Sequence, residues 1–258
     1  KNQSDLRRFR ARRLGMIFQD PATNLNPLFT IREQLVDAVL YQCYESSEVP
    51  GLWRRILPSN RQLRRDAHTR AIELMQLVGI PDGNRRIEEY PHQFSGGMRQ
   101  RVLIAMALAG KPDLLIADEP TTALDVTIQA QILRLITDLV DSLQLTVLLI
   151  THNLGVVAKT CEKAAVMYAG RVVEQAPVRE LFKNPRHPYT RGLIQAVPTR
   201  QTRRGSLEGI PGLIPNLNDP PKGCRFHPRC AEAKAVCRQD VPSIAHIAER
   251  HSVFCHLY

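Results

Sequence analysis

Three runs of mainly apolar residues along this chain each stop at polar side chains. The runs and the polar residues that follow them are 14–18 before Gln19, 114–117 before Asp118 and Glu119, and 146–151 before His152. Apolar runs of this length, closed by turn-forming or polar residues, predict short buried strands. Between the second and third runs, apolar residues recur every three or four positions from Ile128 to Leu143, which predicts an amphipathic helix.

A strand, a helix and another strand in this order predict a parallel crossover and therefore an α/β fold. In open parallel sheets the ligand lies beyond the carboxyl ends of the strands. We therefore expect Gln19, Asp118, Glu119 and His152 to converge on one edge of the sheet. Each could instead simply end its strand in solvent, but four polar groups at three equivalent ends favour a site.

A second pattern precedes the carboxylate strand. Ser95 stands where a helix N-cap belongs, Gly96 and Gly97 follow it, and the helix is expected to stop at Gly110. The amino end of such a helix can present N–H groups and partial positive charge to a phosphate. Together with Asp118 as a magnesium ligand and Glu119 as a base, this helix start predicts half of a nucleotide site. The other half, a G-x-x-x-x-G-K-[ST] loop, is absent from these 258 residues.

Composition limits the classes of protein to consider. With 258 residues, 43% hydrophobic and 23% charged, the chain can form one large domain or two small ones. No apolar run approaches the ~18 residues of a membrane span, and the polar segment that starts at Lys1 lacks a secretory signal. The net charge of +10 could indicate nucleic acid or an anionic membrane, yet the arginine-rich stretch 7–13 holds only Phe9 as an aromatic residue, which favours a solvated basic face.

Four of the six cysteines crowd the last 35 residues: Cys224, Cys230, Cys237 and Cys255. An ATPase-like chain without a secretory signal favours a cytosolic location, where clustered thiols bind metal more often than they form disulfides. The spacing is not that of common zinc ribbons. A tetrahedral zinc, a [4Fe-4S] cluster and reduced structural thiols all stay open, and His227 or His256 could replace a thiol.

Five motifs in a fixed order resemble those of a known protein family. The chain resembles, over nearly its whole length, the nucleotide-binding subunit of an ABC transporter of the dipeptide/oligopeptide/nickel importer branch. The motifs are 17–21 as Q-loop, 94–100 as signature, 114–119 as Walker B, 123–125 as D-loop and 151–153 around the switch histidine. The signature departs from the commonest form at Phe94 and Met98, but it keeps the phosphate-binding turn.

The resemblance implies a fold: a P-loop NTPase-like parallel sheet with helices, an inserted α-helical subdomain and a Pro/Cys-rich carboxyl-terminal extension. The segments expected are 1–29 as partial ATPase core, 30–97 as helical subdomain, 98–175 as ATPase core and 176–258 as extension. We expect the extension to add no further sheet. In the subdomain, Trp53 stands in a predicted loop at 50–55, and a helical stripe is predicted at Ala71, Leu74, Met75, Leu77 and Val78.

The resemblance also implies roles for single residues. Asp118 holds Mg²⁺, Glu119 polarises the attacking water, His152 contacts the γ-phosphate of ATP and Gln19 senses it. Ser95, Gly96 and Gly97 complete the site of the opposite subunit, and Asp125 belongs to the nucleotide-binding residues. For the four cysteines, relatives in this branch imply a [4Fe-4S] cluster, with Zn²⁺ as the alternative.

The implied partners are a second ABC ATPase subunit, identical or paralogous, the membrane-spanning permease subunits and, indirectly, a substrate-binding protein. The implied location is the cytoplasmic face of the bacterial inner membrane, with no nucleic acid bound. Because the phosphate loop is missing, we expect an N-terminally truncated chain that hydrolyses no ATP alone. The alternatives are an ABC-type ATPase that acts on nucleic acid and a binding module without hydrolysis.

Overall fold

The computed structural model describes residues 3–43, 61–122, 124–198 and 209–258. It consists of two compact units, Lys1–His152 and Asn153–Tyr258. The loop predicted at 50–55, with Trp53, lies outside the described residues, as does Ala123 of the D-loop motif.

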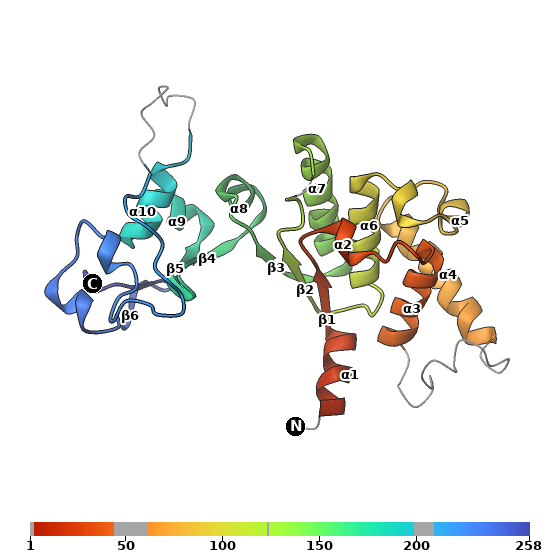
Figure 1. Ribbon diagram of the computed structural model, residues 1–258, viewed down its shortest axis with the longest axis horizontal. Coiled ribbons are helices and arrows are strands. Elements are labelled where there is room, and N and C mark those ends of the chain that lie inside the picture. Colours follow the sequence, from red (N-terminus) through yellow and green to blue (C-terminus); the bar gives the residue numbers. More distant parts are fainter. Residues whose placement is uncertain (1–2, 44–60, 123, 199–208) are drawn as a thin grey trace. The chain divides into compact units, whose positions relative to one another are not determined.

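The first unit is built on a parallel sheet of three strands in the order β1-β2-β3 (Figure 1). The strands are β1 Leu14–Ile17, β2 Leu114–Asp118 and β3 Thr146–Ile150. All three lie within the apolar runs of the sequence, and their parallel pairing confirms the predicted crossover. Their carboxyl ends therefore meet at one edge of the sheet.

The strand register separates two faces of this sheet. One face carries Ile17, Leu115 and Ala117, which are fully buried. It packs so closely against helix α6 (Gly96–Ala107) that a Cβ at Gly15 would lie 2.5 Å from the carbonyl oxygen of Ala107. The register therefore requires a glycine at this position of β1.

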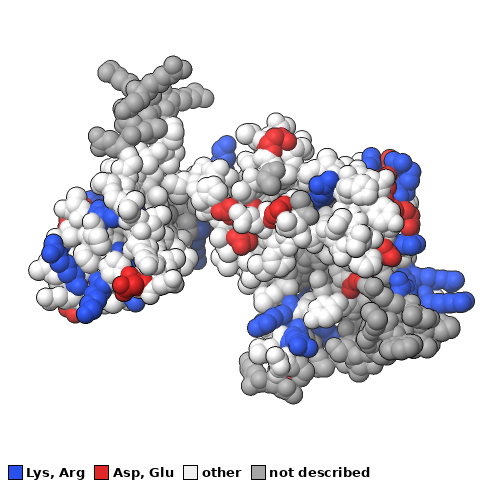
Figure 2. Space-filling view, in the orientation of Figure 1, with Lys and Arg blue, Asp and Glu red and all other residues white. Residues whose placement is uncertain are grey.

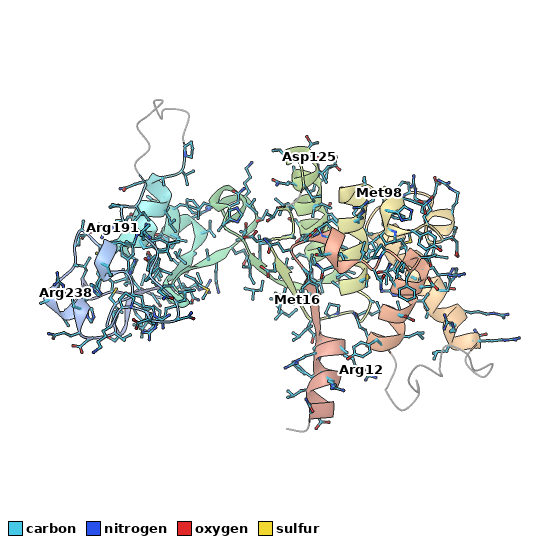
Figure 3. The ribbon with its side chains drawn as sticks, in the orientation of Figure 1. Arg12, Met16, Met98, Asp125, Arg191 and Arg238 are labelled. Atoms are coloured by element: carbon cyan, nitrogen blue, oxygen red, sulfur yellow. The ribbon has the colours of Figure 1, made fainter. Side chains whose placement is uncertain are left out.

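The opposite face of the sheet is apolar and exposed. Met16 on β1, labelled in Figure 3, is 42% exposed, and Leu148 and Ile150 on β3 are 51% and 46% exposed. Parallel sheets are ordinarily covered on both faces. The described part of the chain thus covers only one of the two.

Helices fill most of the rest of the first unit. They are α1 Gln3–Arg13, α2 Pro21–Asn24, α3 Ile31–Cys43, α4 Arg61–Leu77, α5 Gly83–Arg86 and the 3-10 helix η3 Pro91–Gln93. Leu35 of α3, Leu74 and Met75 of α4 and Ile104 of α6 are fully buried in one core. The predicted stripe on α4 is wrong at one position, because Leu77 is 36% exposed whereas Val78, just past the helix, is fully buried. Gly79, at φ +71°, then turns the chain away.

Helix α7 (Val126–Leu143) confirms the amphipathic helix between the last two strands of the sheet. Ile132, Ile136 and Leu139 form its buried stripe. The helix ends where Gln144 takes a left-handed conformation at φ +53°. The chain then enters β3 directly.

The second unit contains a four-stranded antiparallel sheet in the order β4-β5-β7-β6. Its elements are α8 Leu154–Thr160, β4 Lys163–Tyr168, β5 Arg171–Pro177, α9 Val178–Lys183, α10 Pro188–Gln195, η4 His227–Arg229, η5 Ala235–Arg238, β6 Ile244–Ala248 and β7 His251–Phe254. Our expectation that the extension adds no sheet is therefore wrong, because β7 pairs with β5 through Glu174 and Val253. Strands β6 and β7 are short, and the sequence of the proline-rich tail gives little indication of them.

A buried carboxylate joins three segments of the second unit. Glu174 on β5 is fully buried, and its Oε1 accepts a hydrogen bond of 2.7 Å from the backbone N–H of Arg186. Its Oε2 accepts one of 2.9 Å from the N–H of His187, and His251 Nε2 on β7 lies 2.8 Å from Oε1. One side chain of β5 therefore holds both the start of α10 and the last strand.

Candidate nucleotide site

Glu119 occupies the centre of the carboxyl-terminal edge of the first sheet. It follows β2 directly, takes a left-handed backbone at φ +44°, and donates its N–H to the carbonyl of Ile150 at 2.9 Å. Its Oε2 accepts hydrogen bonds from Gln19 Nε2 at 3.0 Å and from the Thr122 hydroxyl at 2.7 Å. His152 Nδ1 lies 2.7 Å from Oε1. The structure therefore brings together Gln19, Glu119 and His152, as the strand ends predict.

These contacts favour the ionised form of the Glu119 carboxyl. The contact with His152 holds its pKa below the usual value of 4.5, and the hydrogen bonds from Thr122 and Gln19 act in the same direction. An ionised carboxylate only accepts hydrogen bonds, so Nδ1 of His152 carries the proton between the two groups. Nε2 of the largely exposed ring is then left for a ligand.

Asp118 is the last residue of β2 and is half-buried. The strand register places it opposite Ile150, next to the strand end that carries Glu119. Carboxylate oxygens are ligands that Mg²⁺ accepts readily in phosphate-handling sites. Asp118 thus has the chemistry and the position that the sequence predicts for a magnesium ligand.

The Ser95-Gly96-Gly97 turn opens helix α6, as predicted. Ser95 is the N-cap, and its hydroxyl accepts a hydrogen bond of 3.3 Å from the N–H of Met98. The helix ends at Ala107, three residues before Gly110. The first turn of α6 therefore points its dipole and its early N–H groups out of the helix at this end.

Gly96 and Gly97 have a packing role that the sequence does not reveal. A Cβ at Gly97 would lie 2.7 Å from Cγ2 of Ile128, on α7. At Gly96 the nearest atom would be Cδ2 of Leu124, at 3.3 Å. The glycines therefore let the amino end of α6 approach the first turn of α7, in addition to any contact with phosphate.

Asp125 is the N-cap of α7. Its Oδ1 accepts a hydrogen bond of 3.0 Å from the N–H of Ile128. Figure 3 shows Asp125 at the same end of the first unit as Met98 of α6. Its position is near the signature turn, while its role toward a nucleotide stays a prediction.

The turn between Glu119 and α7 contributes residues that the motifs did not single out. Thr122 holds the carboxylate of Glu119, as described above. Gln129 on α7 donates through Nε2 to the carbonyls of Thr121 at 2.9 Å and Leu124 at 3.0 Å. In the sequence, the only indication that Thr122 contacts the site is its position three residues after Glu119.

The four tail cysteines all lie in the described part of the second unit. Among the residues that the structure describes, no three His, Cys, Asp or Glu side chains are arranged to hold a metal ion. Burial raises the pKa of the Cys255 thiol, and the thiols of Cys224, Cys230 and Cys237 raise it further. The four thiols thus lie close enough to influence one another, but their arrangement does not support the predicted [4Fe-4S] cluster or zinc centre.

Charged side chains of both signs are mixed on the helical part of the first unit. Figure 2 shows blue and red side chains beside each other at the right edge, where α5 lies in Figure 1. Arg85 and Arg86 lie 3.6 and 3.4 Å from Glu89, and Arg70 lies 2.9 Å from Glu73. At these positions the arginines are therefore paired with carboxylates. None of the described helices is long and apolar enough to cross a membrane.

Comparisons with known proteins decide the family. Residues 1–122 match the ABC transporter family, and residues 173–237 match the family described as "Oligopeptide/dipeptide transporter, C-terminal region". A probable peptide ABC transporter ATP-binding protein of Sinorhizobium fredii is 50% identical over 255 residues, which cover 98% of this chain and 71% of that protein. The chain is an ATP-binding subunit of the oligopeptide/dipeptide family of ABC transporters.

Other relatives of this ABC subunit have similar names. An oligopeptide transport ATP-binding protein of Bacillus subtilis is 43% identical, with 99% of this chain and 73% of that protein covered. A dipeptide transport ATP-binding protein of Haemophilus influenzae is 45% identical, with 94% and 68% covered. The family confirms the resemblance that the five motifs predicted.

Solved structures agree with the fold of this ABC subunit. A post-hydrolysis dimer of an ATP-binding cassette with bound ADP and phosphate matches with a TM-score of 0.54 at 27% identity, over 69% of this chain and 68% of that one. A protein of Clostridium perfringens that is part of an ABC transporter complex gives a TM-score of 0.55 at 24% identity, over 71% of this chain and 64% of that one. The α/β fold with a parallel sheet is therefore that of an ABC ATPase.

Proposed function

We propose that this ABC subunit couples ATP hydrolysis to the import of peptides through separate membrane-spanning subunits. The observation that carries the proposal is the Glu119 carboxylate, which Gln19, Thr122 and His152 hold from three segments at the carboxyl edge of the sheet. The named relatives that transport peptides support the substrate class. The nucleic-acid alternative has no comparable support.

In this proposal Glu119 orients the attacking water and accepts hydrogen bonding from it, because its carboxylate is ionised and fixed in direction. His152 binds the terminal phosphate through Nε2, since its Nδ1 already faces Glu119. Gln19 reports the occupancy of the site through its bond to the same carboxylate. Asp118 would hold Mg²⁺, which neutralises charge on the phosphates of ATP when it is bound.

The partners follow from the same proposal. Ser95, Gly96 and Gly97 complete the nucleotide site of a second ATPase subunit, with Asp125 beside them, and the helical segment 30–97 contacts the permease. A substrate-binding protein delivers the peptide to the permease. The location is the cytoplasmic face of the bacterial inner membrane, held there by the permease. Residues 1–29 and 98–175 form the ATPase core, and 176–258 form the extension.

We propose the metal centre of Cys224, Cys230, Cys237 and Cys255 separately, supported by their clustering in the sequence and by the mutual effect of the thiols. The arrangement of the described side chains gives it no support. Anaerobic purification followed by measurement of iron, sulfide, zinc and the visible spectrum tests it. Colourless, metal-free protein with a folded second unit would rule the centre out.

The transport function has a direct test. The protein is expressed from its own gene together with the permease and reconstituted in vesicles with its binding protein. We expect uptake of labelled di- and oligopeptides that requires ATP and stops in Glu119→Gln. ATP-driven uptake of another solute class, with no peptide uptake, would overturn the peptide assignment while leaving the ATPase assignment in place.

A further inference from the structure

We infer that Thr122 is a positioning residue for ATP hydrolysis, because its hydroxyl fixes the direction of the Glu119 carboxylate. The inference rests on the proposed function, since it concerns the same site. The hydroxyl donates to Oε2 of Glu119 at 2.7 Å, the same oxygen that accepts the 3.0 Å hydrogen bond from Gln19. A hydrogen bond to a charged acceptor is stronger than a neutral one.

The geometry of the carboxylate explains why two donors on one oxygen matter. His152 contacts Oε1, and Thr122 with Gln19 occupies Oε2. With contacts on both oxygens, rotation about the last side-chain bond of Glu119 breaks at least one of them. Thr122 is near Glu119 in the sequence, whereas Gln19 and His152 belong to the ends of other strands. Its hydrogen bond to the carboxylate therefore does not depend on how those two strand ends are placed.

The backbone that carries Thr122 is itself fixed. The N–H of Thr122 donates to the carbonyl of Glu119 at 3.2 Å, closing a tight turn between the two residues. Gln129, on α7, binds the carbonyls of Thr121 and Leu124 on either side of Thr122. A residue of a rigid helix thus sets the position of the loop, and the loop sets the position of the hydroxyl.

Matched variants separate positioning from folding. Thr122→Val replaces the hydroxyl with a methyl group of similar size, Thr122→Ser keeps the hydroxyl, and Thr121→Val makes the same chemical change at the neighbouring residue. In the protein expressed from its own gene with its permease, we expect Thr122→Val to lower kcat about 10-fold with KM for ATP unchanged. Thr122→Ser and Thr121→Val are expected to keep kcat within 2-fold of the wild type.

Gln129→Leu tests the support of the loop. It is expected to lower kcat in the wild-type background and to have little further effect in Thr122→Val, because both changes then act through the same hydrogen bond. The inference is overturned if Thr122→Val hydrolyses ATP at the wild-type rate, or if Thr122→Ser is as impaired as Thr122→Val.

Crystal structures of the 258-residue chain decide the point without hydrolysis. We expect one orientation of the Glu119 carboxylate in the wild type and in Thr122→Ser, and a different or divided orientation in Thr122→Val. An unchanged carboxylate in Thr122→Val would contradict the inference. Wild-type protein that hydrolyses no ATP in its complex would contradict the proposed function instead, and the crystal structures would still test Thr122.

Discussion

His152 Nδ1 lies 2.7 Å from Oε1 of Glu119, although the two residues are 33 positions apart in the chain. This contact is the largest cause of the lowered pKa of Glu119. We therefore expect His152→Ala to raise the pKa of Glu119 toward 4.5. A carbon-13 NMR titration of the glutamate carboxyl groups measures it. No change in the Glu119 titration would show that the contact is absent in solution.

The glycines of the signature turn give a prediction about stability. Gly97→Ala is expected to destabilise the first unit by about 1–3 kcal/mol, since its Cβ would lie 2.7 Å from Cγ2 of Ile128, a methyl group on a stiff β-branched side chain. Urea unfolding measures the change. Gly96→Ala is the matched control, because its Cβ would meet only the end of the Leu124 side chain, at 3.3 Å. Equal effects at the two positions would contradict the packing role of Gly97.

His187 gives a pH dependence to the stability of the second unit. Burial lowers its pKa from 6.5 to about 4, so the folded protein keeps this ring neutral where the unfolded chain is protonated. The contribution of His187 to the free energy of unfolding is therefore fully present above pH 6.5. It is lost as the pH falls toward 4, by on the order of 3 kcal/mol in total.

Denaturant unfolding between pH 4.5 and 7.5 measures this dependence. His187→Asn is the control, because the amide oxygen can still cap α10, as Nδ1 of His187 does for the N–H of Tyr189 at 3.0 Å, and it does not titrate. We expect a shallower loss of stability with falling pH in this variant. Parallel curves for the two proteins would show that His187 does not carry the dependence.

The 258-residue chain by itself is expected to show no ATP hydrolysis above background. It contains no G-x-x-x-x-G-K-[ST] loop, whose amides and lysine hold the β- and γ-phosphates in nucleotide sites of this kind. A phosphate-release assay on the purified chain checks this. Turnover that Glu119→Gln abolishes would refute it.

The sequence predicted the strands of the first unit well because their apolar runs are short and clearly bounded. Gln19, Glu119 and His152 could be placed together because the ends of parallel strands share one edge, which depends on topology alone. The capping role of Ser95 could be predicted from its side-chain chemistry, and helix α7 from the periodicity of its apolar residues. These features depend on neighbours in the chain or on general rules of packing.

Features that depend on contacts between distant segments could not be predicted from the sequence. Strand β7 joins the sheet of the second unit because Val253 pairs with Glu174. The two residues are 79 positions apart, and no local sequence pattern indicates that they pair. The exposure of Leu77 depends on how α4 packs against α3 and α6, since its spacing fits the buried stripe. The spacing of the cysteines could not show whether their side chains are arranged as ligands.

ATP binding and hydrolysis by wild-type protein and Glu119→Gln, each expressed from its own gene with the permease, test the central claim most directly. The account predicts that the variant binds ATP as tightly as the wild type and loses hydrolysis, because the substitution changes no other residue of the site and removes only the carboxylate that orients water. Hydrolysis by Glu119→Gln at the wild-type rate would contradict it.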